Sequence, residues 1–283
     1  MAKRQFSTHA ANPETIDALH DHIPEWMKSS LDSWILKQLS DASYKPLGLM
    51  PDLDLLHRLE RLLRVDLISN AKGREAMQVI FYKMNQNSDI KLDVVDGILQ
   101  LTGTSYSGTG SLEDILLQSG SKWRVAQDES GNYSLEERVD ATTTTAMEDI
   151  VGSGGDVARY ITKAWNEAFG RSPSPSVSYS NAIKAVEAAS WQVVIPDNNR
   201  ATLGVIIKAL RDKPENFQVQ ITEKVSGQGI EAIRNQMSLI WDGQTDRHGT
   251  ANPVEPSQEA AEEALFIALS LCQQFVRGLI SHA

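Results

Sequence analysis

An apolar run, Ala264-Leu265-Phe266-Ile267-Ala268-Leu269-Ser270-Leu271-Cys272, lies in the middle of a helix predicted from Ser257 to Ile280. Because the run is apolar on all sides of the helix, we expect it to pass through a core and not across a surface. Cys272 is the only cysteine of the chain, so neither an intramolecular disulfide nor a cysteine metal cage can form. We interpret it as a buried thiol.

Helical patterns also fill the rest of the second half, where apolar residues recur at three- and four-residue steps. Helices are expected at Asp156 to Phe169, Ser178 to Trp191, Thr202 to Arg211 and Gly229 to Trp241. Short segments rich in proline, glycine and asparagine separate these windows. The second half is therefore predicted to be an all-α bundle with short connections.

The first half is mainly helical in pattern, with one clear β signal. Helices are expected over residues 12–39 with a break at Pro24, and over 53–65, 73–84 and 92–101. The glycine-containing segment Thr102 to Gly110 is expected to be a loop, followed by a short helix capped by Ser111. Alternating residues on both sides of Ser130-Gly131-Asn132 predict a small β-hairpin near residues 122–138.

Length and composition indicate two domains. At 283 residues the chain exceeds the roughly 100 to 200 residues of an ordinary domain. Asp140 to Thr145 and the glycine cluster from Val151 to Gly155 are the best candidates for a boundary region. We expect an N-terminal helical domain with the hairpin over residues 1–150, and a C-terminal helical bundle over residues 151–283.

The charge of the chain limits the partners that it can bind. The formal net charge is −10, and nothing in the composition indicates the broad basic face of a protein that wraps nucleic acid. Contact with RNA is therefore expected to be local, at a cleft with few cations, or to depend on a partner. Apolar runs fall short of the roughly 18 residues of a spanning helix, and the N-terminus carries no secretory pattern. We expect no membrane contact and a cytoplasmic location.

Asp246-Arg247-His248-Gly249, between two predicted helices, is the segment most suited to chemistry. Metal-free RNA cleavage needs an acid or base that titrates near neutral pH and a fixed cation for the phosphate, which histidine and arginine supply. The alternative is a structural loop in which Asp246 braces the turn, Arg247 pairs and Gly249 adopts a positive φ.

A second candidate element is Arg234-Asn235, which falls outside the apolar face of the predicted 229–241 helix. These residues suit a catalytic or phosphate-binding role, and they equally suit a solvated face on which Arg234 pairs with Glu231. The sequence contains no metal-binding motif and no Gly-x-Ser-x-Gly elbow, so we expect no metal and no cofactor.

The second half resembles bacterial proteins of the abortive-infection C-terminal family, which are similar to the HEPN superfamily. The resemblance covers roughly residues 120–280. It is carried by the segments Ala164 to Arg171, Ser178 to Ala189, Thr202-Leu203-Gly204 and Gly243 to Gly249. It implies a dimerising bundle of four or five helices, often a metal-independent ribonuclease of phage defence or of a toxin system.

Carried onto this sequence, the resemblance implies that His248 is the acid or base. Arg247 or Arg234 would bind the phosphate, and Asn235 or Asp246 would orient the pair. The chain departs from the family's motif, in which about four to six positions separate arginine and histidine, because thirteen residues lie between Arg234 and His248.

Three hypotheses follow. The first is a homodimeric endoribonuclease that acts as a defence effector, with a phage or host protein as its trigger. The second is a non-catalytic helical dimerisation or adaptor module of a defence or toxin-antitoxin system. The third is a nucleotide-responsive enzyme that uses the same basic pocket for a small phosphorylated ligand.

Overall fold

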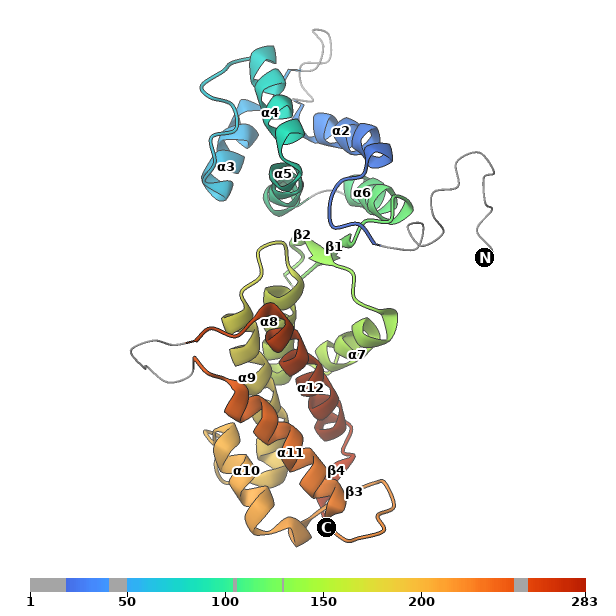
Figure 1. The fold of residues 1–283 in the computed structure, drawn as a ribbon, viewed down its shortest axis with the longest axis vertical. Helices are drawn as coiled ribbons and strands as arrows, with labels where there is room; N and C mark the ends of the chain where they lie inside the picture. Colours follow the sequence, from blue (N-terminus) through green and yellow to red (C-terminus); the bar gives the residue numbers. More distant parts are fainter. Residues whose placement is uncertain (1–18, 41–49, 104–105, 129, 247–253) are drawn as a thin grey trace, which may run out of the picture. The chain divides into compact units, whose positions relative to one another are not determined.

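The computed structural model describes residues 19–40, 50–103, 106–128, 130–246 and 254–283, with only the backbone described over 106–110. The described chain is mainly helical, with a small antiparallel hairpin, which confirms the predicted fold class (Figure 1). It divides into two compact units, Met1–Arg138 and Val139–Ala283, and each has its own hydrophobic core.

The first unit contains a set of helices followed by the hairpin. These are α2 (Glu25–Leu39), α3 (Leu53–Leu63), α4 (Arg74–Gln86), α5 (Ser88–Thr102), α6 (Tyr106–Gln118), β1 (Trp123–Gln127) and β2 (Tyr133–Glu137). The helix α2 begins directly after Pro24, where the sequence predicted a break, because the proline ring cannot sit inside a helix. The predicted helix start at Asn12 and Pro13 lies outside the described residues.

The hairpin closes at the predicted turn. Asp128 accepts hydrogen bonds through Oδ1 from the backbone N–H groups of Ser130 (2.9 Å) and Asn132 (2.8 Å), and Gly131 has a φ of 84°. Asp96 on α5 accepts a further bond from the N–H of Leu135 at 2.7 Å. The strand β2 is thereby fixed against α5.

The second unit contains α7 (Ala141–Val151), α8 (Gly155–Phe169), α9 (Pro175–Val194), α10 (Leu203–Asp212), α11 (Gln228–Gly243) and α12 (Gln258–Val276). A short 3₁₀ turn at Pro214–Asn216 and the strands β3 (Phe217–Val219) and β4 (Ile280–His282) complete it. Ser257 caps α12 by accepting a bond from the N–H of Ala260 at 3.2 Å, so the helix begins where the sequence predicted.

The core of this unit forms where α9 packs against α8 and α12 (Figure 1). Small side chains at these contacts let the helix backbones approach closely. The fully buried or nearly buried alanines are Ala164, Ala168, Ala182, Ala185, Ala261, Ala264 and Ala268. One face of the central run of α12 is buried, whereas Phe266 is 41% exposed and Ser270 is also exposed, so the prediction that the whole run passes through a core is wrong. Cys272 is inaccessible as predicted, which raises the pKa of its thiol.

Three local predictions are corrected by the structure. The predicted loop is helical from Tyr106, so Ser111 lies inside α6 and does not begin a helix. The threonine-rich segment after Asp140 is the helix α7, because that carboxylate accepts bonds from the N–H groups of Thr142 and Thr143, both at 3.0 Å. This helix belongs to the second compact unit, so the same correction moves the boundary from after residue 150 to after Arg138.

The third correction concerns the C-terminal end of the chain. The helix predicted to reach Ile280 ends at Val276, and Gly278 follows with a φ of 66°. Ile280–His282 then forms β4, which pairs antiparallel with β3 and sets His282 opposite Phe217. The sequence did not predict this second small sheet.

Candidate functional site

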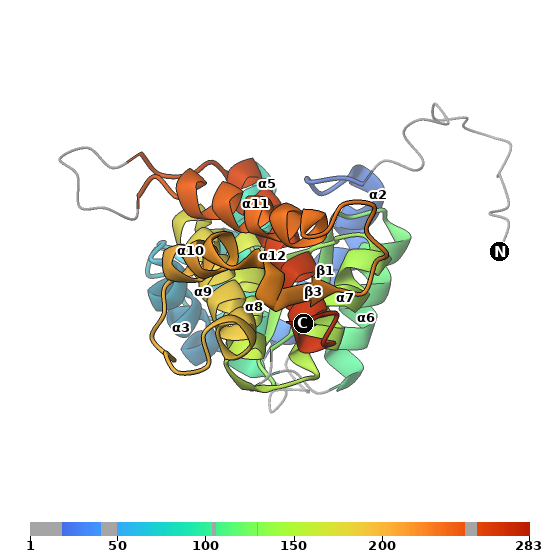
Figure 2. The ribbon, with the colours of Figure 1, turned by 90° about the horizontal axis from the view of Figure 1, so that it is seen from below.

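The helix α11 positions the predicted site residues that the structure describes. Ile230, Ile233, Met237 and Ile240 form its buried face, which confirms the predicted helical periodicity. Arg234 and Asn235 consequently lie on the outer flank. Figures 1 and 2 show α10 and α11 side by side, so this flank borders the end of α10.

The start of α11 is fixed by a carboxylate from the preceding loop. Glu223 accepts hydrogen bonds from the backbone N–H of Gly227 at 2.9 Å and from that of Gly229. A negative charge at this end of a helix also interacts favourably with the helix dipole. A Cβ atom at position 229 would overlap Val219 and the Glu223 carboxylate. This close packing therefore requires Gly229.

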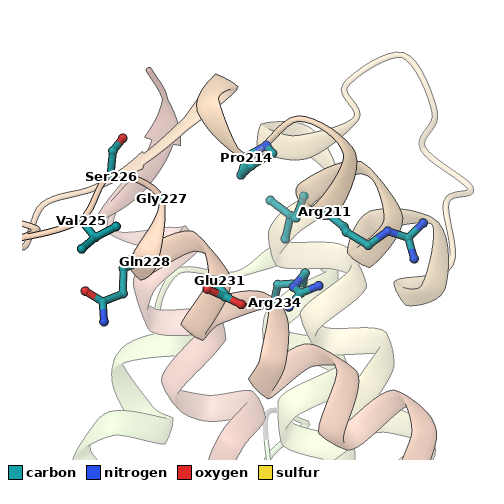
Figure 3. Close-up of a pocket in the computed structure, with 9 residues that line it drawn as sticks. Arg211, Pro214, Val225, Ser226, Gly227, Gln228, Glu231 and Arg234 are labelled. Carbon is teal, nitrogen blue, oxygen red and sulfur yellow. Dashed lines mark ion pairs between the residues drawn. The ribbon is translucent and has the colours of Figure 1, made fainter.

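A pocket of about 420 Å³ lies between the end of α10 and the start of α11. We call it the arginine pocket. It is lined by Leu210, Arg211, Pro214, Val225, Ser226, Gly227, Gln228, Glu231 and Arg234. Figure 3 shows Glu231 and Arg234 next to each other on α11, facing the segment that carries Arg211 and Pro214.

The two guanidinium groups of the arginine pocket have few protein acceptors. Arg234 donates from Nη2 to Oδ1 of Asn235 at 2.8 Å and lies 3.6 Å from Oε1 of Glu231, the ion pair that the sequence suggested. Arg211 pairs through Nε with Oδ1 of Asp212 at 3.1 Å. The Arg234 side chain is 25% exposed and that of Arg211 is 58% exposed, so both remain accessible to a solute.

Asp246 lies beyond the opposite end of α11, in contact with α9. Its Oδ2 accepts a hydrogen bond from the hydroxyl group of Ser176. Its Oδ1 is buried and has no hydrogen-bond partner among the residues that the structure describes. Such an oxygen is costly to leave unpaired, by roughly 1–3 kcal/mol.

Tyr179 adjoins the same place on α9. A Cβ at Gly243 would lie 2.6 Å from the hydroxyl oxygen of Tyr179, so glycine allows α11 to end against this ring. Burial raises the pKa of Tyr179, and the negative charges of Glu263 and Asp246 raise it further. The hydroxyl group therefore stays protonated at neutral pH and can donate a hydrogen bond.

The structure places Arg234 and Asn235 far from Asp246 within one chain. Arg234 and Gly243 belong to one uninterrupted helix, whose nine steps of 1.5 Å place them roughly 13 Å apart along its axis. Arg234 thus lines the arginine pocket with Asn235 bonded beside it, and Asp246 lies beyond the other end of the helix. Arg247 and His248 lie outside the described residues.

No local sequence signal marks Ser176, Tyr179 or Arg211 as site residues, because each reaches its neighbours only through tertiary packing. Glu223 does carry such a signal, because an acid a few residues before two glycines and a helix is a recognisable capping pattern.

No family model, curated protein or solved structure matches the chain. In the described part of the chain, no cluster of three or more histidine, cysteine or acidic side chains is arranged to hold a metal ion. No described helix has the length and apolar character needed to cross a bilayer.

Proposed function

We propose that the chain is a metal-independent endoribonuclease that acts as a homodimer in antiviral defence, as an abortive-infection effector. Its catalytic segment is Asp246-Arg247-His248, which follows α11 in the sequence. The resemblance of the second unit to HEPN-like proteins motivates this assignment, and the surroundings of Asp246 support it.

The observation that carries the proposal is the buried Oδ1 of Asp246, which has no hydrogen-bond partner among the described residues. A buried carboxylate oxygen needs a donor, and the next two residues of the chain are an arginine and a histidine. Ser176 holds the other oxygen and so limits the rotation of the carboxylate. In the working state Asp246 orients His248, as a carboxylate orients the imidazole in many acid and base catalysts.

The reaction needs a base for the 2′-hydroxyl group of RNA and a cation for the adjacent phosphate. His248 removes the proton of the 2′-hydroxyl group, and the ribose oxygen attacks the phosphorus. The bond between phosphorus and the 5′-oxygen then breaks, and the leaving oxygen takes up a proton from water. Arg247 stabilises the charge that develops on the phosphate. Arg234 does not share this role within one protomer, because the continuous α11 keeps it near the opposite end.

The acidic composition of the chain agrees with weak binding of RNA in the absence of a trigger. A net charge of −10 repels RNA at long range, so binding is local and a phage or host trigger protein helps to bring substrate to the site. We assign the sensing of that trigger to the first unit and the chemistry to the second. The site requires no cofactor, and the location is cytoplasmic.

The test is RNA cleavage by purified protein in the presence of EDTA, with wild type compared with His248→Ala and Asp246→Asn. General acid–base catalysis contributes about 10² to 10⁴ in rate, so we expect losses of about a hundredfold or more. His57→Ala is the matched control, since this exposed histidine in α3 pairs with Glu60 at 3.0 Å in the other unit. Equal cleavage by wild type and His248→Ala would show a background nuclease.

A second candidate is a non-catalytic helical dimerisation or adaptor module. It is favoured by the separation of Arg234 and Asn235 from Asp246 along α11, which leaves fewer cations at the end that carries Asp246. Light scattering combined with the cleavage assay distinguishes the two functions. A stable dimer with no cleavage of any RNA, even with a trigger present, supports the adaptor.

A further inference from the structure

We infer that the arginine pocket binds a nucleotide, that is, a small ligand with a phosphate group and a ring. This inference does not depend on the proposed ribonuclease, whose catalytic segment follows the other end of α11 in the sequence. The volume of about 420 Å³ falls within the roughly 300–1,000 Å³ of ordinary small-ligand sites. Its walls come from two helices and the loop between them, so ligand groups can be held from several sides.

Two arginines from different helices line the pocket and supply the donors for a phosphate. Among the described residues no acceptor bonds to the Nη atoms of Arg211, whose single ion pair uses Nε. Arg234 keeps Nε and Nη1 unbonded to any described residue, and its 3.6 Å separation from Glu231 exceeds hydrogen-bond length. A guanidinium group can donate two parallel hydrogen bonds to the oxygens of one phosphate. The donors that the chain itself leaves unused therefore suit a phosphate group of a ligand.

The rest of the pocket suits a sugar and a ring. Leu210, Pro214 and Val225 provide an apolar wall. Val225 is 66% exposed, so its side chain is accessible to the ring of a ligand. Gln228 and Ser226 offer hydrogen bonds to ring or sugar groups, and Glu231 can accept from ribose hydroxyls. An inorganic phosphate would contact the arginines but leave this wall open to water.

The pocket is preformed, which lowers the cost of binding. Glu223 already occupies the backbone N–H groups of Gly227 and Gly229, so the loop at the start of α11 is held in place. The same contact removes these N–H groups as an anion site. A phosphate in the pocket is therefore bound by side chains, and its affinity must depend on Arg211 and Arg234.

Calorimetric titration of the full chain with nucleoside monophosphates and with inorganic phosphate tests the inference. The Arg247→Gln protein is used, because it removes the phosphate-binding group of the proposed catalytic segment and leaves the arginine pocket intact. We expect the best nucleotide to bind at least about tenfold more tightly than phosphate, since burying the ring adds apolar contact. Arg211→Gln and Arg234→Gln should each weaken binding about tenfold or more, since each removes a charge-assisted hydrogen bond.

Lys208→Gln is the matched control, because it also removes one positive charge from α10. Lys208 is exposed and does not line the pocket. It should change the affinity less than about threefold, because an exposed charge that does not line the pocket is screened by water and salt. Thermal unfolding of each variant without ligand verifies that the fold is retained. Three results would overturn the inference: no binding of any nucleotide, equal affinity for phosphate and nucleotide, or unchanged affinity in the two arginine variants.

Discussion

The hydroxyl group of Ser176, in the first turn of α9, donates a hydrogen bond to Oδ2 of Asp246, which lies seventy residues further along the chain. This contact ties the segment after α11 to α9. It leaves Oδ1 of the same carboxylate buried and without a described partner. The proposed chemistry depends on this orientation of Asp246.

Ser176→Ala is therefore expected to lower RNA cleavage about tenfold, a loss of roughly 1.4 kcal/mol, because the carboxylate loses the contact that orients it. Ser178→Ala is the matched control on the same helix, since its buried hydroxyl donates to the carbonyl oxygen of Ala164 at 2.9 Å. That change should lower the free energy of unfolding by about 1 kcal/mol and leave cleavage unchanged. Equal cleavage by Ser176→Ala and wild type would show that Ser176 does not orient Asp246 for the reaction.

Gly204 lets α10 pack directly on α11. A Cβ at this position would lie 2.9 Å from the indole ring of Trp241. Gly204→Ala should therefore destabilise the protein by about 1–3 kcal/mol, as overpacking does, and this is measurable by urea denaturation. The double variant Gly204→Ala with Trp241→Leu should recover part of the loss. Additive losses in the double variant would show that this contact is not the cause.

Lys91 in the first unit is 2% exposed and donates to Oδ1 of Asp32 and Oδ1 of Asn85, both at 2.7 Å. Asp32→Ala should cost about 3 kcal/mol in unfolding free energy, because it leaves a buried ammonium group without a counter-charge. Lys91→Met should cost less, since Asp32 is 31% exposed and water can solvate it. Chemical denaturation of both variants checks this order, and a larger loss for Lys91→Met would contradict it.

Glu187 on α9 gives a pH dependence. Burial raises the pKa of its carboxyl group above the ordinary 4.5, while the N–H of Leu203, which donates to Oε1 at 2.6 Å, and Lys184 lower it in part. The folded state thus holds the proton more tightly, and stability falls as the pH rises from below 4.5 through the raised pKa.

Glu187→Gln keeps the acceptor for Leu203 and removes the buried charge. It should raise the free energy of unfolding at pH 7 relative to wild type, and the difference should vanish below pH 4.5. Glu148→Gln on α7 is the matched control at pH 7, because it removes an exposed charge that water already solvates, and it should not raise the free energy of unfolding as Glu187→Gln does. A pH-independent effect of Glu187→Gln would contradict the assigned cause.

Several elements could be predicted from local signals. The helices α3, α8 and α10 agree with their predicted windows within about two residues, because amphipathic periodicity and the flanking glycine and proline residues mark them. The hairpin followed from its Ser130-Gly131-Asn132 turn. Elements without local signals were missed: β3 and β4 have three residues each, and their pairing joins Phe217 to His282.

The candidate site was only partly predictable for the same reason. Periodicity placed Arg234 and Asn235 correctly on the outer flank of α11, and the possibility of a pair with Glu231 was visible from its spacing. Local sequence could not show that Ser176 meets Asp246 or that Arg211 meets the start of α11. Those relationships depend on how α9, α10 and α11 pack.

The identity of the RNA product ends tests the central claim most directly. Wild-type protein in EDTA is incubated with an RNA and with its 2′-O-methylated copy. Attack by a 2′-hydroxyl group predicts 2′,3′-cyclic phosphate and 5′-hydroxyl ends from the RNA, no product from the methylated copy, and a loss of about a hundredfold or more in Asp246→Asn. Absence of cleavage, cleavage of the methylated copy, or 5′-phosphate ends would contradict the account.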